Sequence, residues 1–190
     1  MSQAFEQLRG LLVALPPDPD PGMLARVGAA FAALGPADVD LEVHAAPLRG
    51  PAREWWSVHL LRAPRAQLSL LLLPAGTVIP LHDHPGMHVW TRALRGRVCL
   101  ESWDWLAPPA PPETPARRTG ERWLEPGNAA QEAGPLAGNV HRLESPAPSV
   151  LLDLFAPPYD ESAGRPCRYW GPAAPPGPDG AGRLRFLRQA

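Results

Sequence analysis

Two histidines, His82 and His84, are separated by one residue and are the side chains best placed to do chemistry together. If this segment is extended, both imidazoles lie on one face and Asp83 points to the other, because side chains alternate along a strand. Such a pair supplies two metal ligands without any bend in the backbone. Neutral imidazole binds iron, zinc, copper and nickel. The spacing therefore predicts part of a metal site on a strand.

A third ligand must come from a neighbouring strand, and His141 is the best candidate. It follows Gly138 in the stretch Gly-Asn-Val-His, as the first histidine pair follows Gly76. An isolated His-x-His pair also occurs by chance in packed or surface segments. The third histidine, in a similar setting after a glycine turn, is what makes a three-histidine metal site the better interpretation.

If the strand continues past His84, two further side chains point to the same face as His82 and His84. His88 lies four residues after His84 and could be a ligand, a hydrogen-bonding partner of a ligand or a packing residue; we favour the partner role. Arg92 has the same parity and could receive a substrate carboxylate. The other histidines, His44 and His59, have no companion motif and are expected to be ordinary residues.

A carboxylate and a phenol near the C-terminal half are also candidates. Asp153 lies in an otherwise apolar run, 149–155, and a buried carboxylate is costly unless it is paired. It either binds an arginine or backbone N–H groups, or it orients a metal ligand or receives a substrate amine. Tyr159 follows two prolines, which stiffen the loop and could hold the phenol over a cavity; packing is the alternative.

The elements that must position these residues are mostly short strands. Residues 3–15 and 22–34 have helical spacing and end at Pro16 and Gly35. Beyond them, apolar or alternating runs are separated by glycine and proline. The expected strands are 54–62, 67–73, 87–94, 97–105, 139–144 and 149–155. This pattern indicates a mainly β sandwich or barrel with short N-terminal helices.

Two stretches rich in proline and glycine are expected to be irregular. Residues 107–116 read as a long surface loop, and 171–182 as a flexible connection to a short terminal segment. Either could be a binding element, but a solvated spacer is the simpler interpretation. A chain of 190 residues favours one domain. We expect a helical segment over 1–40, the barrel core over 41–170, and the connection and terminal segment over 171–190.

Composition excludes several classes of protein. A net charge of −1 gives no reason to expect nucleic acid or an anionic membrane as partner. Two cysteines, Cys99 and Cys167, are fewer than a secreted disulfide scaffold carries. The apolar run 11–15 is too short for a signal peptide, and no run is long enough to span a membrane. We expect a soluble, monomeric, cytoplasmic protein.

The histidine motifs look like those of the cupin superfamily, a small β-barrel of jelly-roll type. The patterns are G-x5-H-x-H over 76–84 and G-x2-H over 138–141. In this comparison the position where many cupins carry a glutamate ligand falls at or next to His88. That departure indicates a site of three histidines without a carboxylate.

Two longer stretches resemble one family more specifically. PLHDHPGMHVW, residues 80–90, looks like the metal-binding stretch of the cysteamine dioxygenase and plant cysteine oxidase family. Residues 139–170 are similar to its C-terminal block, with the patterns L-D-x-x-x-P-P-Y and G-R-x-C-x-Y. The resemblance covers roughly residues 41–170.

The resemblance implies a mononuclear non-haem Fe(II) enzyme. Members add both atoms of O2 to the thiol of cysteamine, or of an N-terminal cysteine on a peptide, to give a sulfinic acid. Asp153 and Tyr159 match polar residues near the family's active site. The residues expected to hold the iron are His82, His84 and His141.

Cys167 and Tyr169 are two residues apart and would share one face of a strand. Oxidising iron nearby could link them as a thioether, since some thiol dioxygenases have a Cys–Tyr crosslink. Packing is the simpler interpretation.

The substrate is expected to be an aminothiol without a carboxylate at the alpha carbon, because no arginine lies within the metal motifs 80–90 and 138–141. Two other functions compete with this one. The first is a zinc site with a bound hydroxide in a hydrolase or hydratase. The second is a non-catalytic cupin that binds a small ligand. Metal analysis together with O2 consumption separates these classes.

Overall fold

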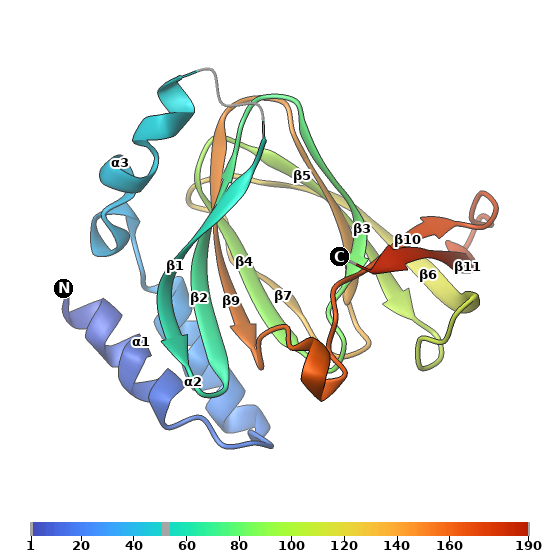
Figure 1. Ribbon diagram of the computed structural model, residues 1–190, viewed down its shortest axis with the longest axis horizontal. Helices are drawn as coiled ribbons and strands as arrows, with labels where there is room; N and C mark the ends of the chain where they lie inside the picture. The colour runs from blue at the N-terminus through green and yellow to red at the C-terminus, as the bar shows by residue number, and fades with distance from the viewer. Residues whose placement is uncertain (1, 51–53, 190) are drawn as a thin grey trace.

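The computed structural model describes residues 2–50 and 54–189 and shows two antiparallel sheets facing each other, with helices along one side (Figure 1). The first sheet has the order β1-β2-β9-β4-β7. Its strands are β1 (Trp56–Ala63), β2 (Ala66–Leu73), β9 (Ser149–Ala156), β4 (His88–Arg95) and β7 (Gln131–Ala133). The expected mainly β, jelly-roll architecture of a cupin is thereby confirmed.

The second sheet closes on itself in the order β10-β11-β6-β5-β8-β3. Its strands are β10 (Arg168–Pro172), β11 (Ala181–Gln189), β6 (Glu113–Leu124), β5 (Val98–Trp105), β8 (Val140–Ser145) and β3 (Thr77–Asp83). Closure depends on the pairing of β10 with β3, where Tyr169 lies opposite His82. The C-terminal strands therefore reach the histidine motif directly.

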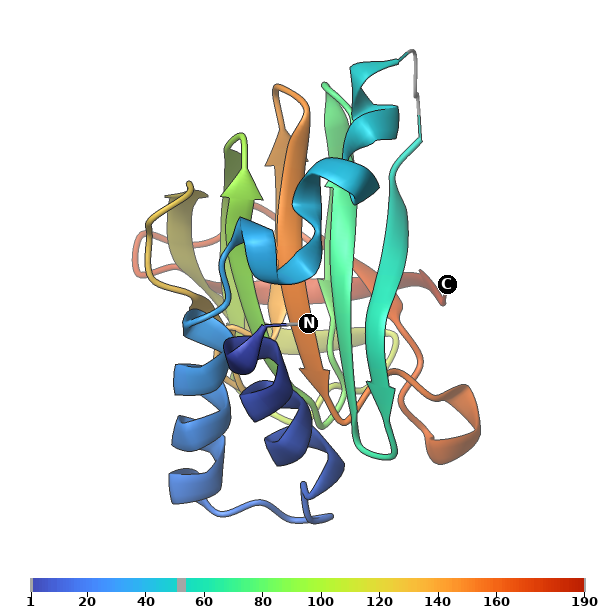
Figure 2. The ribbon, with the colours of Figure 1, turned by 90° about the vertical axis from the view of Figure 1, so that its left-hand side faces the viewer.

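Two helices cover the outer face of the first sheet, as Figure 2 shows. They are α1 (Gln3–Val13) and α2 (Pro21–Ala32), close to the expected bounds. The Ser2 hydroxyl accepts from Phe5 N at 3.2 Å, and the Asp20 carboxylate accepts from Met23 N at 2.7 Å; both cap free N–H groups at a helix start. Shorter helical turns follow: η1 (Pro36–Val39), α3 (Leu41–His44) and η2 (Ala46–Arg49), with η3 (Glu161–Ala163) near the C-terminus. No helix among the described residues is long and apolar enough to cross a membrane.

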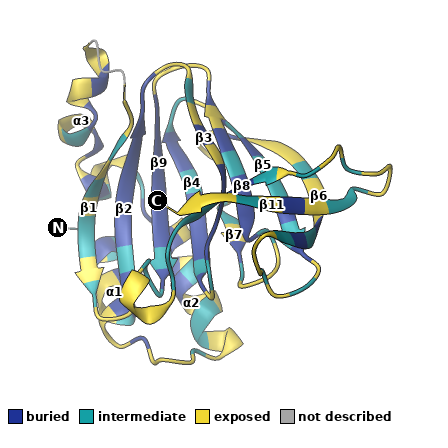
Figure 3. Cartoon of the chain, turned by 45° about the vertical axis from the view of Figure 1, so that its right-hand side comes forward, coloured by how far each residue is buried: buried dark blue, intermediate teal, exposed yellow. Residues whose placement is uncertain are grey.

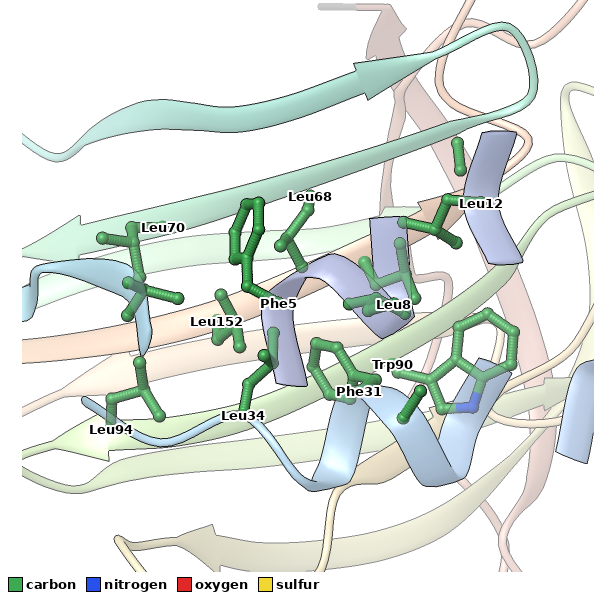
Figure 4. Packing of buried hydrophobic residues seen from close by; sticks show 14 of the residues in the cluster. Phe5, Leu8, Leu12, Phe31, Leu34, Leu68, Leu70, Trp90, Leu94 and Leu152 are labelled. Carbon is green, nitrogen blue, oxygen red and sulfur yellow. The ribbon is translucent and has the colours of Figure 1, made fainter. Parts of the chain in front are cut away.

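The core between helices and sheet is apolar and closely packed (Figure 4). Leu8, Leu12 and Phe31 from the helices are fully buried against Leu68 and Leu152 of the sheet. Each such side chain contributes about 1.5–3 kcal/mol through burial. Figure 3 shows that β2 and β9 are buried along most of their length, so the first sheet is covered on both faces.

The expectation of a surface loop over 107–116 is wrong in its second half. Strand β6 begins at Glu113, and Thr114 and Ala116 are buried. The Thr114 hydroxyl accepts from Ala110 N at 2.8 Å and donates to Ala110 O at 2.9 Å. The prolines therefore form a short turn that leads into a paired strand.

The expectation of a flexible connection over 171–182 is also wrong. This segment is the turn of a β-hairpin whose second strand, β11, pairs with both β10 and β6. Gly180 has φ +78°, and a Cβ there would lie 2.3 Å from the Arg118 carbonyl oxygen, so the turn requires glycine. The terminal segment belongs to the barrel, and the helical segment extends to Arg49 instead of ending at residue 40. Residues 1, 51–53 and 190 of the expected single domain lie outside the described residues.

Candidate metal centre

Three buried imidazoles converge inside the barrel. His82 is the penultimate residue of strand β3 and lies directly opposite His141 of β8, and His84 is the first residue after β3. The three ring centroids are 4.6–5.0 Å apart, and one nitrogen from each ring lies within 4.8 Å of the others. Within the described part of the chain, no carboxylate joins this cluster. The fold thus assembles three nitrogen donors from two neighbouring strands.

A β-bulge in β3 sets which of its side chains face the cavity. Ile79 lies opposite Leu143, but His82 lies opposite His141, so β3 carries one extra residue between the two pairs. The extra residue lets both Ile79 and His82 face inward, which regular alternation would forbid. Bulges commonly re-aim a side chain beside an active site.

All three histidines are held in the uncharged form that binds metals. Burial lowers the pKa of His82 to about 4. Burial, followed by the neighbouring imidazoles, lowers the pKa of His84 and of His141 well below the ordinary value. A neutral imidazole keeps a lone pair free for a metal ion at physiological pH.

Hydrogen bonds determine which nitrogen of two rings faces the cluster. Nδ1 of His82 donates to the Pro80 carbonyl at 2.9 Å. The Tyr159 hydroxyl donates to the Asp83 carbonyl at 2.9 Å, so its oxygen accepts from Nδ1 of His84 at 2.6 Å. Both rings therefore present a bare Nε2, as outer hydrogen bonds do in metal sites.

The donor atoms fit one divalent transition-metal ion. Nε2 of His84 and Nε2 of His141 lie 3.0 Å apart, so two nitrogen lone pairs would repel across this gap. An ion about 2.1 Å from each nitrogen would instead bind both. Nδ1 of His141 is buried and has no partner among the described residues. Three imidazoles without a carboxylate suit iron, zinc, copper or nickel.

An ion pair anchors the metal-binding stretch to the end of the barrel. Asp83 is fully buried and points away from the histidines, as strand alternation predicts. Arg168 of β10 donates to its carboxylate from Nη2 at 2.6 Å and from Nε at 2.9 Å, and the Arg168 backbone N–H donates at 3.1 Å. Burial raises the pKa of Asp83, and Arg168 opposes that shift. Removing either partner would leave a buried charge uncompensated.

Asn139 holds the backbone at His84 in place, a role that no motif in the sequence indicates. Its side-chain oxygen accepts from His84 N at 3.2 Å, and its nitrogen donates to His84 O at 2.8 Å. Trp105 Nε1 donates to the same oxygen at 3.1 Å. Asn139 thus holds the second ligand of the pair and precedes the third by two residues.

The histidines open into a cavity of about 200 Å³ between the two sheets. Asp153 of β9 lies on the opposite wall, in register between Ser69 of β2 and Thr91 of β4. Burial raises the pKa of Asp153 to about 7, although a hydrogen bond with Thr91 lowers it. Its Oδ1 has no hydrogen-bond partner in residues 2–50 and 54–189. Of the two interpretations of Asp153, the geometry favours the one in which the carboxylate faces a substrate.

Aromatic and thiol side chains form the rest of the wall near His84. Phe155 stacks on the His84 ring with centroids 6.0 Å apart, a contact that the sequence did not predict. Cys167 lines the same wall, and burial raises the pKa of its thiol to about 11. Cys167 and Tyr169 both line the cavity, where packing stays the simpler interpretation and a thioether stays the alternative.

The favoured interpretation of His88 as a partner of a ligand is wrong, and so is that of Arg92 as a carboxylate partner, whereas packing, the third alternative for His88, fits the structure. Both side chains lie on the outer face of β4, because the turn after His84 separates β3 from β4 and resets the alternation. His88 stacks on Trp90 with centroids 6.2 Å apart, outside the cavity. Arg92 donates to the carbonyls of Ala32 and Leu34 at the end of α2, the latter at 3.1 Å. Neither residue can serve a ligand or a substrate.

Comparison with known proteins identifies relatives of the chain. The 2-aminoethanethiol dioxygenase of Mus musculus is 34% identical over 137 residues, covering 60% of this chain and 52% of that protein. Plant cysteine oxidase 1 of Arabidopsis thaliana is 31% identical over 117 residues, covering 60% of this chain and 40% of that protein. The chain thus spans about half the length of the curated relatives it matches.

A solved cupin superfamily protein from Desulfitobacterium hafniense is similar to the chain, with a TM-score of 0.42 and 14% identity over 57% of this chain and 84% of that chain. The family model PCO_ADO matches residues 31–177. That range contains the three histidines and the facing wall of the cavity, and it confirms the resemblance seen in the motifs. The chain belongs to the PCO_ADO family.

Proposed function

We propose that this protein is an Fe(II)-dependent dioxygenase that adds both atoms of O2 to an aminothiol and releases a sulfinic acid. The observation that carries the proposal is a cluster of three neutral imidazoles that faces a buried carboxylate across a small cavity. The names of its relatives, a 2-aminoethanethiol dioxygenase and a plant cysteine oxidase, support the same chemistry.

Three neutral imidazoles suit this reaction because they would hold a divalent ion without adding negative charge to the site. When bound, Fe(II) supplies the acidity that converts a thiol to a thiolate and the redox chemistry that lets O2 react with its sulfur. Holding the reactants together makes the formation of the sulfur–oxygen bonds effectively intramolecular. His82, His84 and His141 would hold the ion.

The residues around the histidines have separate tasks in this proposal. Asp153 accepts a proton from the substrate, since a pKa of about 7 leaves a large fraction of the carboxylate ionised at neutral pH. Tyr159 keeps the His84 ring in one tautomer through the chain of hydrogen bonds to the Asp83 carbonyl. Asp153 is thus a catalytic residue, and Tyr159 is a positioning residue.

The cavity favours a substrate with an amine and no carboxylate beside the thiol. No arginine is among the described residues that line the cavity, and Arg92 points away from it. Arg168 lies nearby, but its guanidinium is committed to Asp83. We therefore propose cysteamine or a Cys-initiated peptide as substrate. We also propose a monomer in the reducing cytoplasm, a setting in keeping with the free thiols of Cys99 and Cys167.

The test is anaerobic reconstitution with iron, followed by O2 and a panel of thiols under one O2 concentration. The panel contains cysteamine, a short Cys-initiated peptide, L-cysteine and 3-mercaptopropionate, with products identified by mass spectrometry. We expect sulfinic acids, with the highest kcat/KM for the two carboxylate-free aminothiols. A preference for L-cysteine or 3-mercaptopropionate would overturn the substrate assignment. Zinc in the purified protein with no O2 consumption after iron loading would favour a hydrolase.

A further inference from the structure

A row of polar side chains crosses the inner face of the first sheet from its edge to the cavity. His59 of β1 lies opposite Ser69 of β2, Ser69 lies opposite Asp153 of β9, and Asp153 lies opposite Thr91 of β4. Strand β1 forms the edge of this sheet (Figure 1), and His59 is exposed. Ser69 and Asp153 are buried, so the row runs from solvent to the interior.

The Ser69 hydroxyl lies between an imidazole on one neighbouring strand and a carboxylate on the other. Nδ1 of His59 lies 3.0 Å from the Ser69 hydroxyl oxygen, and Gln67 Nε2 donates to the same oxygen at 3.2 Å. The hydroxyl can therefore donate to His59, and the strand register places Asp153 on its other side. Side chains directly opposite on antiparallel strands have Cβ atoms about 4.5–5.5 Å apart. No hydrogen bond joins Ser69 to Asp153 among the described residues, and Oδ1 of Asp153 is buried without a partner, so a proton passes between them when a side chain rotates or a water bridges the gap.

We propose that His59 and Ser69 form a proton path between Asp153 and solvent. This inference rests on the proposed function, whose balance requires such a path. In RSH + O2 → RSO2− + H+, the S–H bond and the O–O bond break, two S–O bonds form, the sulfur loses four electrons, and O2 gains them. One proton must leave the buried cavity in each turnover. Asp153 takes it, Ser69 passes it on, and His59 releases it to water.

Among the described residues, the other titratable groups around Asp153 do not carry its proton to solvent. The proton therefore leaves on the side of Ser69 and His59. Across the cavity lie the three histidines that would hold the metal. Beside them, the Tyr159 hydroxyl donates to the Asp83 carbonyl and accepts from His84, and Cys167 and Tyr169 line the same wall. At the outer end, burial and Arg62 lower the pKa of His59, which favours release of a proton to water.

The kinetic test uses iron-loaded Ser69→Ala and His59→Gln, with Ser69→Thr to retain the hydroxyl and His44→Gln as a matched control outside the row. We expect kcat to fall by about 10-fold or more in the first two, with full metal content and a larger solvent deuterium isotope effect. Ser69→Thr and His44→Gln should resemble the wild type. A bulky buffer base such as MES should restore the rate of His59→Gln as its concentration rises, while the wild-type rate stays constant.

A second measurement needs no turnover. In metal-free protein, the tautomer ratio of His59 is followed by nitrogen-15 NMR, with and without Asp153→Asn. We expect Asp153→Asn to shift this ratio when Ser69 is present and to leave it unchanged in the Ser69→Ala background. An equal response in both backgrounds, or none in either, would overturn the path. Oxidation of thiols at wild-type rates by Ser69→Ala and His59→Gln would also overturn it while sparing the proposed function. An inactive wild type with intact coupling between His59 and Asp153 would overturn the proposed function alone.

Discussion

The two faces of the first sheet differ sharply although they are made by the same strands. On β9, Leu152 and Leu154 point outward and pack under the helices, whereas Asp153 and Phe155 point inward to the cavity. The outer face buries apolar surface, which stabilises the fold. The inner face can then carry a buried carboxylate that lowers stability. Substitutions on the two faces should therefore separate stability from chemistry.

The largest effect is expected at the metal ligands of the inner cavity. His141→Ala should remove most of the bound iron and all oxygenation, because two imidazoles alone would hold the ion weakly. The thermal unfolding of the metal-free protein should change little, since the helix-packed core is untouched. Metal analysis, O2 consumption and circular dichroism measure these three quantities. Full iron occupancy in this variant would refute the three-histidine assignment.

A core substitution on the outer face should do the reverse. Phe31→Ala removes a fully buried ring and should lower the free energy of unfolding by about 3–5 kcal/mol. Iron content and kcat/KM per folded molecule should stay at wild-type levels. Val13→Ala, an exposed position in the helical layer, is the control and should change stability by less than about 0.5 kcal/mol. Lost activity in folded Phe31→Ala would show that the two faces are coupled.

Asp153→Asn tests the chemistry of the inner face without removing the metal. We expect turnover to fall by about 10- to 100-fold with iron content unchanged, the range for residues that support a metal site. The amide keeps the size of the side chain but cannot accept the substrate proton. Wild-type turnover together with altered stability would make Asp153 a structural residue.

The same variant should alter how the stability of metal-free protein depends on pH. Asp153 holds its proton up to pH about 7 when folded but releases it near pH 3.8 when unfolded. Between these values the folded state binds more protons, so this group lowers stability as pH rises. The stability of Asp153→Asn relative to wild type should therefore increase from pH 4 to pH 7 and then level off. The histidines are common to both proteins and cancel, and a constant difference across this range would contradict the raised pKa.

The smallest effect is expected for His88, whose ring lies on the outer face of the first sheet. His88→Ala should leave iron content and kcat/KM near wild-type values, because this ring lies on the outer face beside Trp90. Metal analysis and steady-state kinetics of this variant, beside His141→Ala, give the sharpest contrast between two histidines. A large loss of iron in His88→Ala would mean that the ring reaches the cavity.

The sequence predicted features that depend on local patterns. The spacing of His82 and His84 revealed the metal stretch, and apolar periodicity revealed the helices and most strands. The alternation rule then failed at His88, since it cannot cross the turn that separates β3 from β4. Strand β11 was missed because the proline- and glycine-rich hairpin turn before it resembles a spacer. No companion motif accompanies His59, whose neighbour Ser69 comes from pairing with β2.

The missed features depend on pairing between distant strands. Ser69 and Asp153 are far apart in sequence, and only the β2–β9 register brings them together. The same holds for Asp83 and Arg168, whose pairing follows from closure of the barrel. No local signal fixes such a register when neighbouring strands are all apolar, because several alignments would bury the same surface.

The fate of the oxygen atoms gives the most direct test. Iron-loaded protein is supplied with oxygen-18 gas and either cysteamine or a Cys-initiated peptide, and the products are analysed by mass spectrometry. We predict a sulfinic acid with two heavy oxygen atoms, one O2 consumed per product, and no such product from His141→Ala. A product with one heavy oxygen atom, a disulfide without any, or equal turnover by His141→Ala would contradict a thiol dioxygenase built on these three histidines.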